Sequence, residues 1–390
     1  MLVAAHSGCQ GGAELCLDVL LSGTDPAVYE LDVRFACDGP MVDRCRRSGW
    51  SAAVEPWAWW LGYEPSGWYR RNLWGKGWLR VLRYAALIRR GDFDLVYTNS
   101  AVIFEPALAA RLAGVPHIWH VHEILDPAFW PTRLTSFPSA ARRLSRWSRR
   151  LIFESHAARR VCEAYIESAK TRVIHNPLRF GADDAACPRV REQAAALRSR
   201  LGLTPEDVMV LWLGRFSPRK DPLLLVRAAA RLADRSDLPN VVPVFLGEGP
   251  LLSQVADALG NHGRICEFQA DVRPWLAACD VLTLTSRQES FGLVLLEAAA
   301  FGKPVIATRA EGPAEVVREG ETGLLIPPGD DAALAEALAL LADRRDVRQR
   351  MGQAAQRWAF EHFSADRYVQ AVHAVWAECW EACPSNPGAS

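Results

Sequence analysis

Residues 281–308 read VLTLTSRQESFGLVLLEAAAFGKPVIAT, in which a β-rich run, a helix-length segment and a second β-rich run follow one another. VLTLTS and PVIAT are rich in β-branched residues, whereas LVLLEAAA has the composition of a helix. A strand, a helix and a further strand in this order are the unit from which parallel sheets are built. The stretch therefore predicts an α/β fold.

The same alternation continues on both sides of this stretch. The β-rich runs are LVAA, DLVY, HIWHV, LIFE and RVIH in the first half, and VMVLWLG, VVPVFLG, RICEF and GLLI in the second. Each half opens with a strand followed by glycine, in HSGCQGG and in LGRFSPRK. The pattern predicts two Rossmann-like, doubly wound parallel-sheet domains that face each other across a cleft, with ligands bound outside the carboxyl ends of the strands.

A chain of 390 residues exceeds the size at which single cores stop growing, which predicts two domains. A polar stretch rich in Ala and Arg separates the halves and carries the turn signals GADD and LTPED. The final segment has apolar residues at four-residue spacing and predicts an amphipathic helix that packs on the body and crosses back to the first domain. The expected parts are an N-terminal domain over 1–185, a linker over 186–205, a nucleotide-sugar-binding domain over 206–363, and a C-terminal helix and tail over 364–390.

Composition narrows the classes of partner. Lys plus Arg and Asp plus Glu both number 45, so no net charge attracts nucleic acid. The ten cysteines lack paired zinc spacing, which favours a reducing compartment. No apolar run approaches the roughly 20 residues that span a bilayer. These features predict a cytoplasmic protein.

Two carboxylates stand out in ESFGLVLLEA. Glu289 lies in the loop before the expected helix, and Glu297 follows about two turns inside it. A helix N-terminus offers unpaired N–H groups to a phosphate, and carboxylates accept hydrogen bonds from vicinal hydroxyls. The structural alternative is a capping acid at Glu289 and an exposed helical charge at Glu297.

Two cations follow a buried strand in LWLGRFSPRKDP. Arg215 and Lys220 are placed there at the carboxyl edge of the second sheet, where two fixed positive charges can hold a diphosphate. The alternative is that Lys220 belongs only to the start of the helix that Pro222 opens.

At this point the chain resembles the retaining glycosyltransferases of family 4, which have the GT-B fold. The resemblance covers nearly the whole chain and rests on ESFGLVLLEA, GRFSPRKDP, GLLIPPGD and GGAE, in the expected order. It implies that Glu297 binds the ribose, Glu289 a donor-sugar hydroxyl, and Arg215 and Lys220 the diphosphate. It also implies that backbone amides from Ser290, Phe291, Gly292 and Leu293 bind the sugar.

The first domain adds three residues to this candidate site. Gly11 and Gly12 follow the first strand, where backbone amides can approach an oxyanion, although any tight strand-to-helix turn uses such glycines. His122 ends HIWHVH and resembles the family's active-site histidine. A zinc site is the alternative, but residues one or three apart on a strand diverge in direction. No metal ligands are assigned.

The resemblance implies a metal-independent hexosyltransferase that acts by front-side displacement with retention. No cofactor is expected beyond the co-substrate, a UDP- or GDP-linked sugar, and the acceptor is expected to be a glycan, a lipid-linked molecule or a small molecule in cell-surface polysaccharide or glycoconjugate synthesis. A sugar-nucleotide epimerase or hydrolase on the same fold is the first alternative, because a fold does not fix its reaction. A non-catalytic sugar-nucleotide-binding protein is the second.

Residues 57–90 hold six tryptophans and three tyrosines among basic residues. Aromatic and basic residues together suit the membrane interface, and aromatic faces also stack on sugars. The segment is the candidate acceptor side, with peripheral contact to the inner face of the plasma membrane. Burial of these tryptophans in the core is the alternative.

Overall fold

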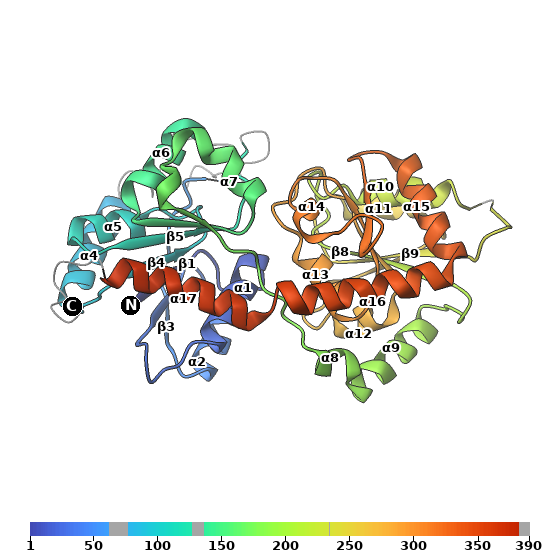
Figure 1. The fold of residues 1–390 in the computed structure, drawn as a ribbon, viewed down its shortest axis with the longest axis horizontal. Helices are drawn as coiled ribbons and strands as arrows, with labels where there is room; N and C mark the ends of the chain where they lie inside the picture. Colours follow the sequence, from blue (N-terminus) through green and yellow to red (C-terminus); the bar gives the residue numbers. More distant parts are fainter. Residues whose placement is uncertain (62–76, 127–135, 234, 382–390) are drawn as a thin grey trace. The chain divides into compact units, whose positions relative to one another are not determined.

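The computed structural model describes residues 1–61, 77–126, 136–233 and 235–381. The chain divides into two compact units, a first unit of Met1–Pro177 with Ala365–Ser390 and a second unit of Leu178–Ser364. Each unit contains one parallel sheet with helices on both faces (Figure 1). This confirms the prediction of two doubly wound α/β domains.

The first unit is built on a sheet of seven parallel strands in the order β3-β2-β1-β4-β5-β6-β7. The strands are β1 (Leu2–Ala5), β2 (Asp32–Phe35), β3 (Ser51–Val54), β4 (Val96–Asn99), β5 (His117–Val121), β6 (Arg150–Phe153) and β7 (Thr171–Val173). The α-helices described in this unit are α1 (Gly12–Ser22), α2 (Pro40–Arg47), α4 (Gly77–Arg90), α5 (Glu105–Ala113), α6 (Phe137–Trp147), α7 (His156–Cys162) and α17 (Ala365–Glu381).

Strands β2 and β3 are absent from the sequence prediction. DVRF in β2 alternates charged and apolar residues over only four positions, and SAAV in β3 lacks large apolar side chains. β3 is the edge strand and is partly exposed along its length. Such a strand can form without large apolar side chains, so its sequence carries only a weak strand pattern.

The second unit has six parallel strands in the order β10-β9-β8-β11-β12-β13. They are β8 (Val208–Leu213), β9 (Val241–Leu246), β10 (Arg264–Cys266), β11 (Val281–Leu284), β12 (Val305–Thr308) and β13 (Gly323–Ile326). The α-helices are α8 (Ala182–Ala186), α9 (Pro188–Arg200), α10 (Pro222–Ala230), α11 (Leu252–Leu259), α12 (Arg273–Ala278), α13 (Leu293–Ala300), α14 (Pro313–Val316), α15 (Asp331–Asp343) and α16 (Arg345–His362).

Strand β8 shows how the second sheet is buried on both faces. Met209 and Leu211 point into one apolar cluster with residues of α9, α12, α13 and α16. Val210 and Trp212 point into the opposite cluster with residues of α10, α11 and α15. Successive side chains of a strand alternate between faces, so VMVLWL supplies both cores at once.

The unit boundary differs from the predicted linker. The chain passes from the first unit to the second after Pro177, and the stretch predicted as a linker, 186–205, belongs to the second unit. Most of it forms α9, whose Val190, Ala194 and Leu197 are buried at helical spacing. At the other end of the chain, α17 contacts α1 and β5 of the first unit through a face that includes Tyr368, Val372 and Trp376.

The aromatic segment 57–90 is described only in part, since residues 62–76 lie outside the described ranges. Trp57 and Trp60 belong to the core of the first unit, and the ring of Trp60 stacks on that of Trp119 with centroids 6.1 Å apart. For these two residues the core alternative holds. On α4, Trp78 is 55% exposed and Leu79 is 67% exposed. The membrane contact stays a prediction, and none of the described helices is both long and apolar enough to cross a bilayer.

Candidate active site

The strand orders define a switch point in each sheet. In the second unit, β8 and β11 are neighbours from which the chain winds in opposite directions. Doubly wound sheets bind ligands outside the carboxyl ends of such a pair. The loop after β8 carries Arg215 and Lys220, and the loop after β11 carries Glu289. The structure therefore places these predicted residues of the second unit at its switch point.

Glu289 and Lys220 form an ion pair between the two loops. The Lys220 ammonium donates to Oε2 of Glu289, and the Ser286 hydroxyl donates to the same oxygen at 2.9 Å. The Lys220 carbonyl accepts from the Thr285 hydroxyl at 2.9 Å, and that hydroxyl accepts from the indole of Trp212 at 2.8 Å. A buried tryptophan of β8 thus fixes the backbone from which the lysine projects.

Burial alone would raise the pKa of Glu289, but the charges of Lys220 and Arg219 and two hydrogen bonds outweigh it, so the pKa lies below its usual value. The carboxylate is therefore ionised at neutral pH. An ionised carboxylate beside an ammonium can accept a sugar hydroxyl's hydrogen bond while the ammonium faces a phosphate.

We expect Glu289→Gln to lower the free energy of unfolding by about 1–3 kcal/mol at pH 7, because it leaves Lys220 without its counter-charge. The folded-state pKa of Glu289 is depressed. The ionised Glu289 carboxylate therefore makes its full contribution to the free energy of unfolding above the ordinary carboxyl pKa of about 4.3. That contribution is lost as the pH falls through the lower pKa of the folded state. Urea unfolding of the wild type and of Glu289→Gln at pH 7 and in acid checks this. The difference between their free energies of unfolding should narrow only as the pH falls below the ordinary carboxyl pKa. A difference that is equally large in acid would contradict the ion-pair account.

The loop between Glu289 and α13 leaves the helix N-terminus open. Gly292 is the N-cap, with φ at 95°, and no side chain caps the helix. A Cβ at Gly292 would lie 2.9 Å from a methyl carbon of Leu284, so both conformation and space favour glycine. Phe291 is 1% exposed and anchors the loop in the core. The first amides of α13, beginning at Leu293, therefore have no side-chain acceptor among the described residues and suit an oxyanion or sugar oxygens.

Glu297 is buried rather than exposed, which excludes the surface-charge alternative for this residue. Arg179 binds it, with Nε donating to Oε1 at 2.9 Å. The prediction that Glu297 lies two turns into the helix is wrong: α13 begins at Leu293, so Glu297 is one turn from the N-terminus. The helix is apolar on nearly every side, and periodicity alone could not locate its start.

Two arginines of the β8 loop differ in their contacts. Arg219 Nη1 donates to the carbonyl of Gln288 at 3.0 Å and so links the same two loops as Lys220. The Arg215 guanidinium is exposed and makes no hydrogen bond or ion pair with any residue of the described ranges. Sequence reasoning found Arg215 but missed Arg219 and Arg179, because only the fold shows which arginines face a carboxylate.

In the first unit, the switch point lies between β1 and β4. Gly11 and Gly12 follow β1 and lead into α1, which has no side-chain cap. A Cβ at Gly11 would lie 2.6 Å from Oε2 of Glu14, so glycine lets that carboxylate fold back over the loop. Glu14 in turn lies 2.9 Å from Nδ1 of His6. Burial lowers the pKa of His6, but the charge and hydrogen bond of Glu14 raise it by more. The pKa of His6 therefore lies above its usual value.

His122 follows β5 at the same edge and is held from two sides. Its Nε2 lies 3.0 Å from Oδ1 of Asn99, at the end of β4, and its Nδ1 lies 3.5 Å from Oε2 of Glu154, after β6. Its ring stacks on His120 with centroids 4.1 Å apart. These contacts fix the orientation of an imidazole at the carboxyl edge of three neighbouring strands.

The zinc alternative for HIWHVH finds no geometric support within the described ranges. His117 hydrogen-bonds to Thr98 at 2.7 Å and to Ser148 at 3.0 Å. His120 instead bonds to the hydroxyl of Tyr97. Burial lowers the pKa of His117 to about 3 and that of His120 well below its usual value, so both are neutral side chains of the core.

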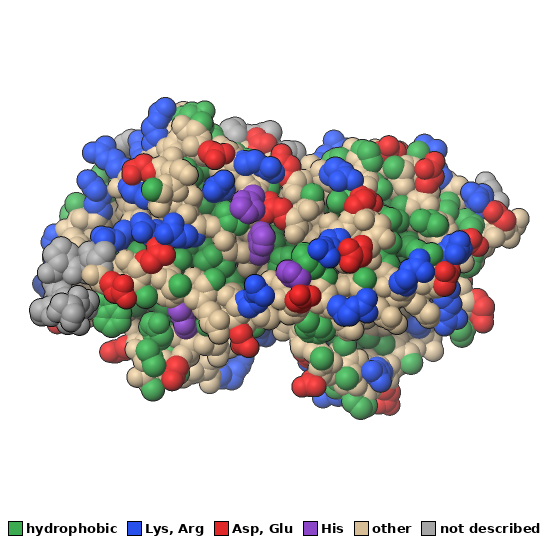
Figure 2. Space-filling view, viewed as in Figure 1, with side chains coloured by type: hydrophobic (Ala, Val, Ile, Leu, Met, Phe, Trp, Pro, Cys, Tyr) green, Lys and Arg blue, Asp and Glu red, His purple; other side chains and the backbone are tan. Residues whose placement is uncertain are grey.

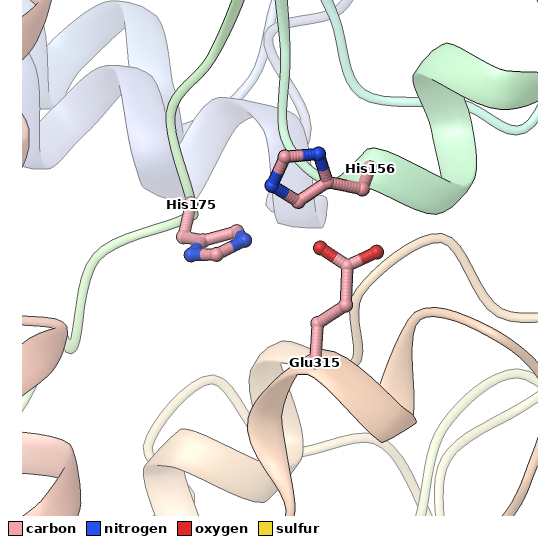
Figure 3. Close-up of side chains that lie close together, drawn as sticks. All are labelled: His156, His175 and Glu315. Atoms are coloured by element: carbon pink, nitrogen blue, oxygen red, sulfur yellow. The ribbon is translucent and has the colours of Figure 1, made fainter.

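Two further histidines lie at this edge and were not singled out from the sequence. His156 opens α7 directly after β6, and His175 follows β7 (Figure 3). Their ring centroids are 6.0 Å apart with an interplanar angle of 73°. Only the parallel pairing of β6 with β7 brings them together, since they are far apart in the sequence.

Comparison with known proteins gives matches over both halves of the chain. Residues 11–179 match the model for Glycosyltransferase Family 4, and residues 194–358 match that for Glycosyl transferases group 1. D-inositol 3-phosphate glycosyltransferase of Streptomyces scabiei is 34% identical over 314 residues, which cover 74% of this chain and 68% of the relative. The lipopolysaccharide core biosynthesis glycosyltransferase LpsE of Rhizobium meliloti is 35% identical over 182 residues, 44% of this chain and about half (52%) of the relative.

Among solved structures, that of Anabaena HepE in complex with UDP and glucose superposes with a TM-score of 0.79 at 24% identity, over 96% of this chain and 99% of that chain. This likeness bears on the fold, which is GT-B. The family matches and the Streptomyces scabiei relative, which aligns over 68% of its own length, show that the chain belongs to the family 4 glycosyltransferases.

Proposed function

We propose that the chain transfers a hexose from a nucleoside-diphosphate donor to a glycan, a lipid-linked molecule or a small molecule, with retention of anomeric configuration and without a metal ion. The observation that supports this most is the Lys220–Glu289 ion pair beside the uncapped N-terminus of α13, at the switch point of the second sheet. Within one pair of loops, this arrangement combines a cation that can bind a phosphate, a carboxylate that can accept a hydrogen bond from a hydroxyl, and amides that can bind oxyanions.

The donor site follows from these contacts. Lys220 and Arg215 would bind the diphosphate. The backbone of Lys220 is held by its loop, and the guanidinium of Arg215 is exposed to solvent. Glu297 would bind the ribose diol, with Arg179 holding its carboxylate in a fixed orientation. Glu289 would accept a hydrogen bond from a sugar hydroxyl, while the amides from Ser290 to Leu293 bind the sugar.

In the first unit, the amides at Gly11 and Gly12 would approach an oxyanion of the donor. On the acceptor side, His122 would orient a hydroxyl. The fixed imidazole between Asn99 and Glu154 supports this role, because an orienting group must itself be held in place. The free cysteines among the described residues fit a protein of the reducing cytoplasm.

In the proposed reaction, the bond from the anomeric carbon to the phosphate oxygen breaks as the acceptor oxygen bonds to that carbon from the same face. The acceptor's proton passes to the departing phosphate oxygen, and the nucleoside diphosphate leaves. Arg215 and Lys220 stabilise the charge that develops on the diphosphate. The two cations would supply the stabilisation that a metal supplies elsewhere.

A donor panel tests the proposal. HepE was solved with UDP-glucose, so UDP-glucose is the first candidate, followed by GDP-linked sugars. Selective binding to the folded state raises the midpoint of thermal unfolding. We expect one nucleotide class to stabilise the wild type, and the shift to shrink in Lys220→Ala and Glu297→Ala. The absence of a shift with every donor would contradict the proposal.

We further expect EDTA to leave the rate of transfer unchanged, within about twofold, because the chain's own cations face the diphosphate. The anomeric configuration of the product, measured by NMR during the first turnovers, should equal that of the donor sugar. Loss of activity with EDTA and its rescue by Mg²⁺ would contradict metal independence. An inverted product would contradict front-side displacement.

A further inference from the structure

A surface hollow of about 460 Å³ lies at the amino edge of the first sheet, the opposite edge of that sheet from His122. It is lined by the end of α5 and the turn into β5, by the turn from α6 into β6, and by the residue before β7. Its volume is within the range of small-molecule pockets. Neither the proposed transfer reaction nor any residue of the candidate active site uses it.

The lining contains five cations and no carboxylate: Arg111, Arg146, Arg149, Arg150 and Lys170. Two of these are paired outside the hollow, Arg150 with Glu378 at 2.9 Å and Lys170 with Glu167 at 2.8 Å. Within the part of the chain that the structure describes, the side chains of the other three make no hydrogen bond or ion pair. The space-filling view shows Lys and Arg side chains gathered over α5 and α6 (Figure 2).

Helix capping does not account for these three arginines. Cations near a helix C-terminus interact favourably with its dipole, and Arg111 and Arg146 lie in the last turns of α5 and α6. The carbonyl of Leu112 at the end of α5, however, accepts from Arg89 of α4, not from Arg111. Arg149 lies beyond the end of α6 and caps nothing by its side chain. Like charges collected around one hollow repel each other, which an anion would offset.

We infer that this hollow binds a phosphate-bearing ligand, a phosphomonoester or diphosphate group held by Arg111, Arg146 and Arg149. Guanidinium groups match phosphate oxygens in a two-point geometry, and here they come from three positions around one opening. The buried imidazole of His117 forms part of the wall and has both nitrogens hydrogen-bonded to hydroxyls of the chain, so it adds no charge of its own. The ligand is either a lipid headgroup or a soluble phosphate ester.

Calorimetric titration with inorganic pyrophosphate tests the inference on the full chain. Because pyrophosphate also suits the proposed donor site, every protein carries Arg215→Ala and Lys220→Ala. The pocket set is Arg111→Gln, Arg146→Gln and Arg149→Gln. The control set is Arg189→Gln, Arg350→Gln and Arg357→Gln. These three arginines are exposed and make no hydrogen bond or ion pair with another described residue, so the set removes the same charge away from the hollow.

We expect the control set to bind pyrophosphate as the parent does and the pocket set to bind it at least about tenfold more weakly, the effect of losing one or more charge-assisted contacts. Equal affinity of the two sets, or no binding by the parent, would overturn the inference. Because Arg111 and Arg146 are exposed, we expect the pocket set to unfold at the parent's temperature, which a thermal scan checks.

Vesicles distinguish the two sources of phosphate. Sedimentation is compared for vesicles of phosphatidylcholine alone and for vesicles of equal parts phosphatidylcholine and phosphatidic acid, whose headgroup is a phosphomonoester. If the pocket set loses both pyrophosphate and the anionic vesicles while the control set keeps both, the ligand is a lipid headgroup. If the pocket set loses pyrophosphate but sediments like the control set, the ligand is a soluble phosphate ester. Pyrophosphate binding that survives in the pocket set contradicts both.

Discussion

Replacing Lys220 with alanine is expected to lower kcat roughly 10²–10³-fold, the usual cost of removing a preorganised group that faces developing charge. The ammonium is tied to Glu289, and its backbone carbonyl is fixed by the Thr285 hydroxyl. On the proposed mechanism it meets more charge in the transition state than in the bound donor, so kcat should fall more than donor affinity. Initial rates of nucleoside-diphosphate formation over a range of donor concentrations measure both constants.

The control for this prediction is Lys303→Ala. Lys303 is half-buried like Lys220, and its ammonium donates to the carbonyl of Ala277 at 2.9 Å, but it precedes β12 at the amino edge of the same sheet. Its loss should leave kcat within about twofold of wild type, as expected of a group away from the reaction. Equal effects of the two substitutions would show that Lys220 acts only on folding, and an unchanged kcat in Lys220→Ala would remove it from the proposed site.

Glu297→Ala is expected to raise the donor KM about 10–100-fold, which corresponds to the loss of one charge-assisted hydrogen bond. The carboxylate is 4% exposed and held by Arg179, so it is already oriented for a ribose diol before the donor binds. Since the ribose is remote from the reacting bond, kcat should change less than KM. The same initial-rate measurement separates the two.

Two variants accompany Glu297→Ala. Glu297→Gln keeps the shape and one acceptor but removes the charge, so its donor KM should lie between those of the wild type and the alanine variant. Glu336→Ala removes an exposed carboxylate from α15 and should change neither constant. A donor KM that stays at the wild-type value in Glu297→Ala, with a folded protein, would contradict the ribose assignment.

Much of the fold could be predicted from the sequence because buried parallel strands are nearly continuous apolar runs. HIWHV, VMVLWL and VIAT carry that signal and form β5, β8 and β12. β2 and β3 lie toward one edge of the first sheet and need less apolar surface, so DVRF and SAAV gave too weak a pattern. The helix α9 was missed for another reason: its buried Val190, Ala194 and Leu197 are small or few among charged residues.

Some features of the candidate site could be predicted from the sequence, and others depend on the fold. Local spacing placed Glu289, Lys220 and Arg215 at carboxyl ends of strands, since each follows a strand within a few residues. The partner of Glu297 could not be predicted, because Arg179 is 118 positions away in the sequence and only the packing of α13 brings the two together. The contacts of His122 with Asn99 and Glu154 likewise depend on the order β4-β5-β6, which no single strand encodes.

The measurement that tests the central claim most directly is release of nucleoside diphosphate from the stabilising donor, with and without an acceptor. D-inositol 3-phosphate and a lipopolysaccharide core, the acceptors that two relatives' names suggest, form the first panel. The account predicts release that requires an acceptor and that falls in Lys220→Ala. Release at one rate with every acceptor and with none would identify a hydrolase, and a bound donor that is never consumed would identify a binding protein; either result would contradict glycosyl transfer.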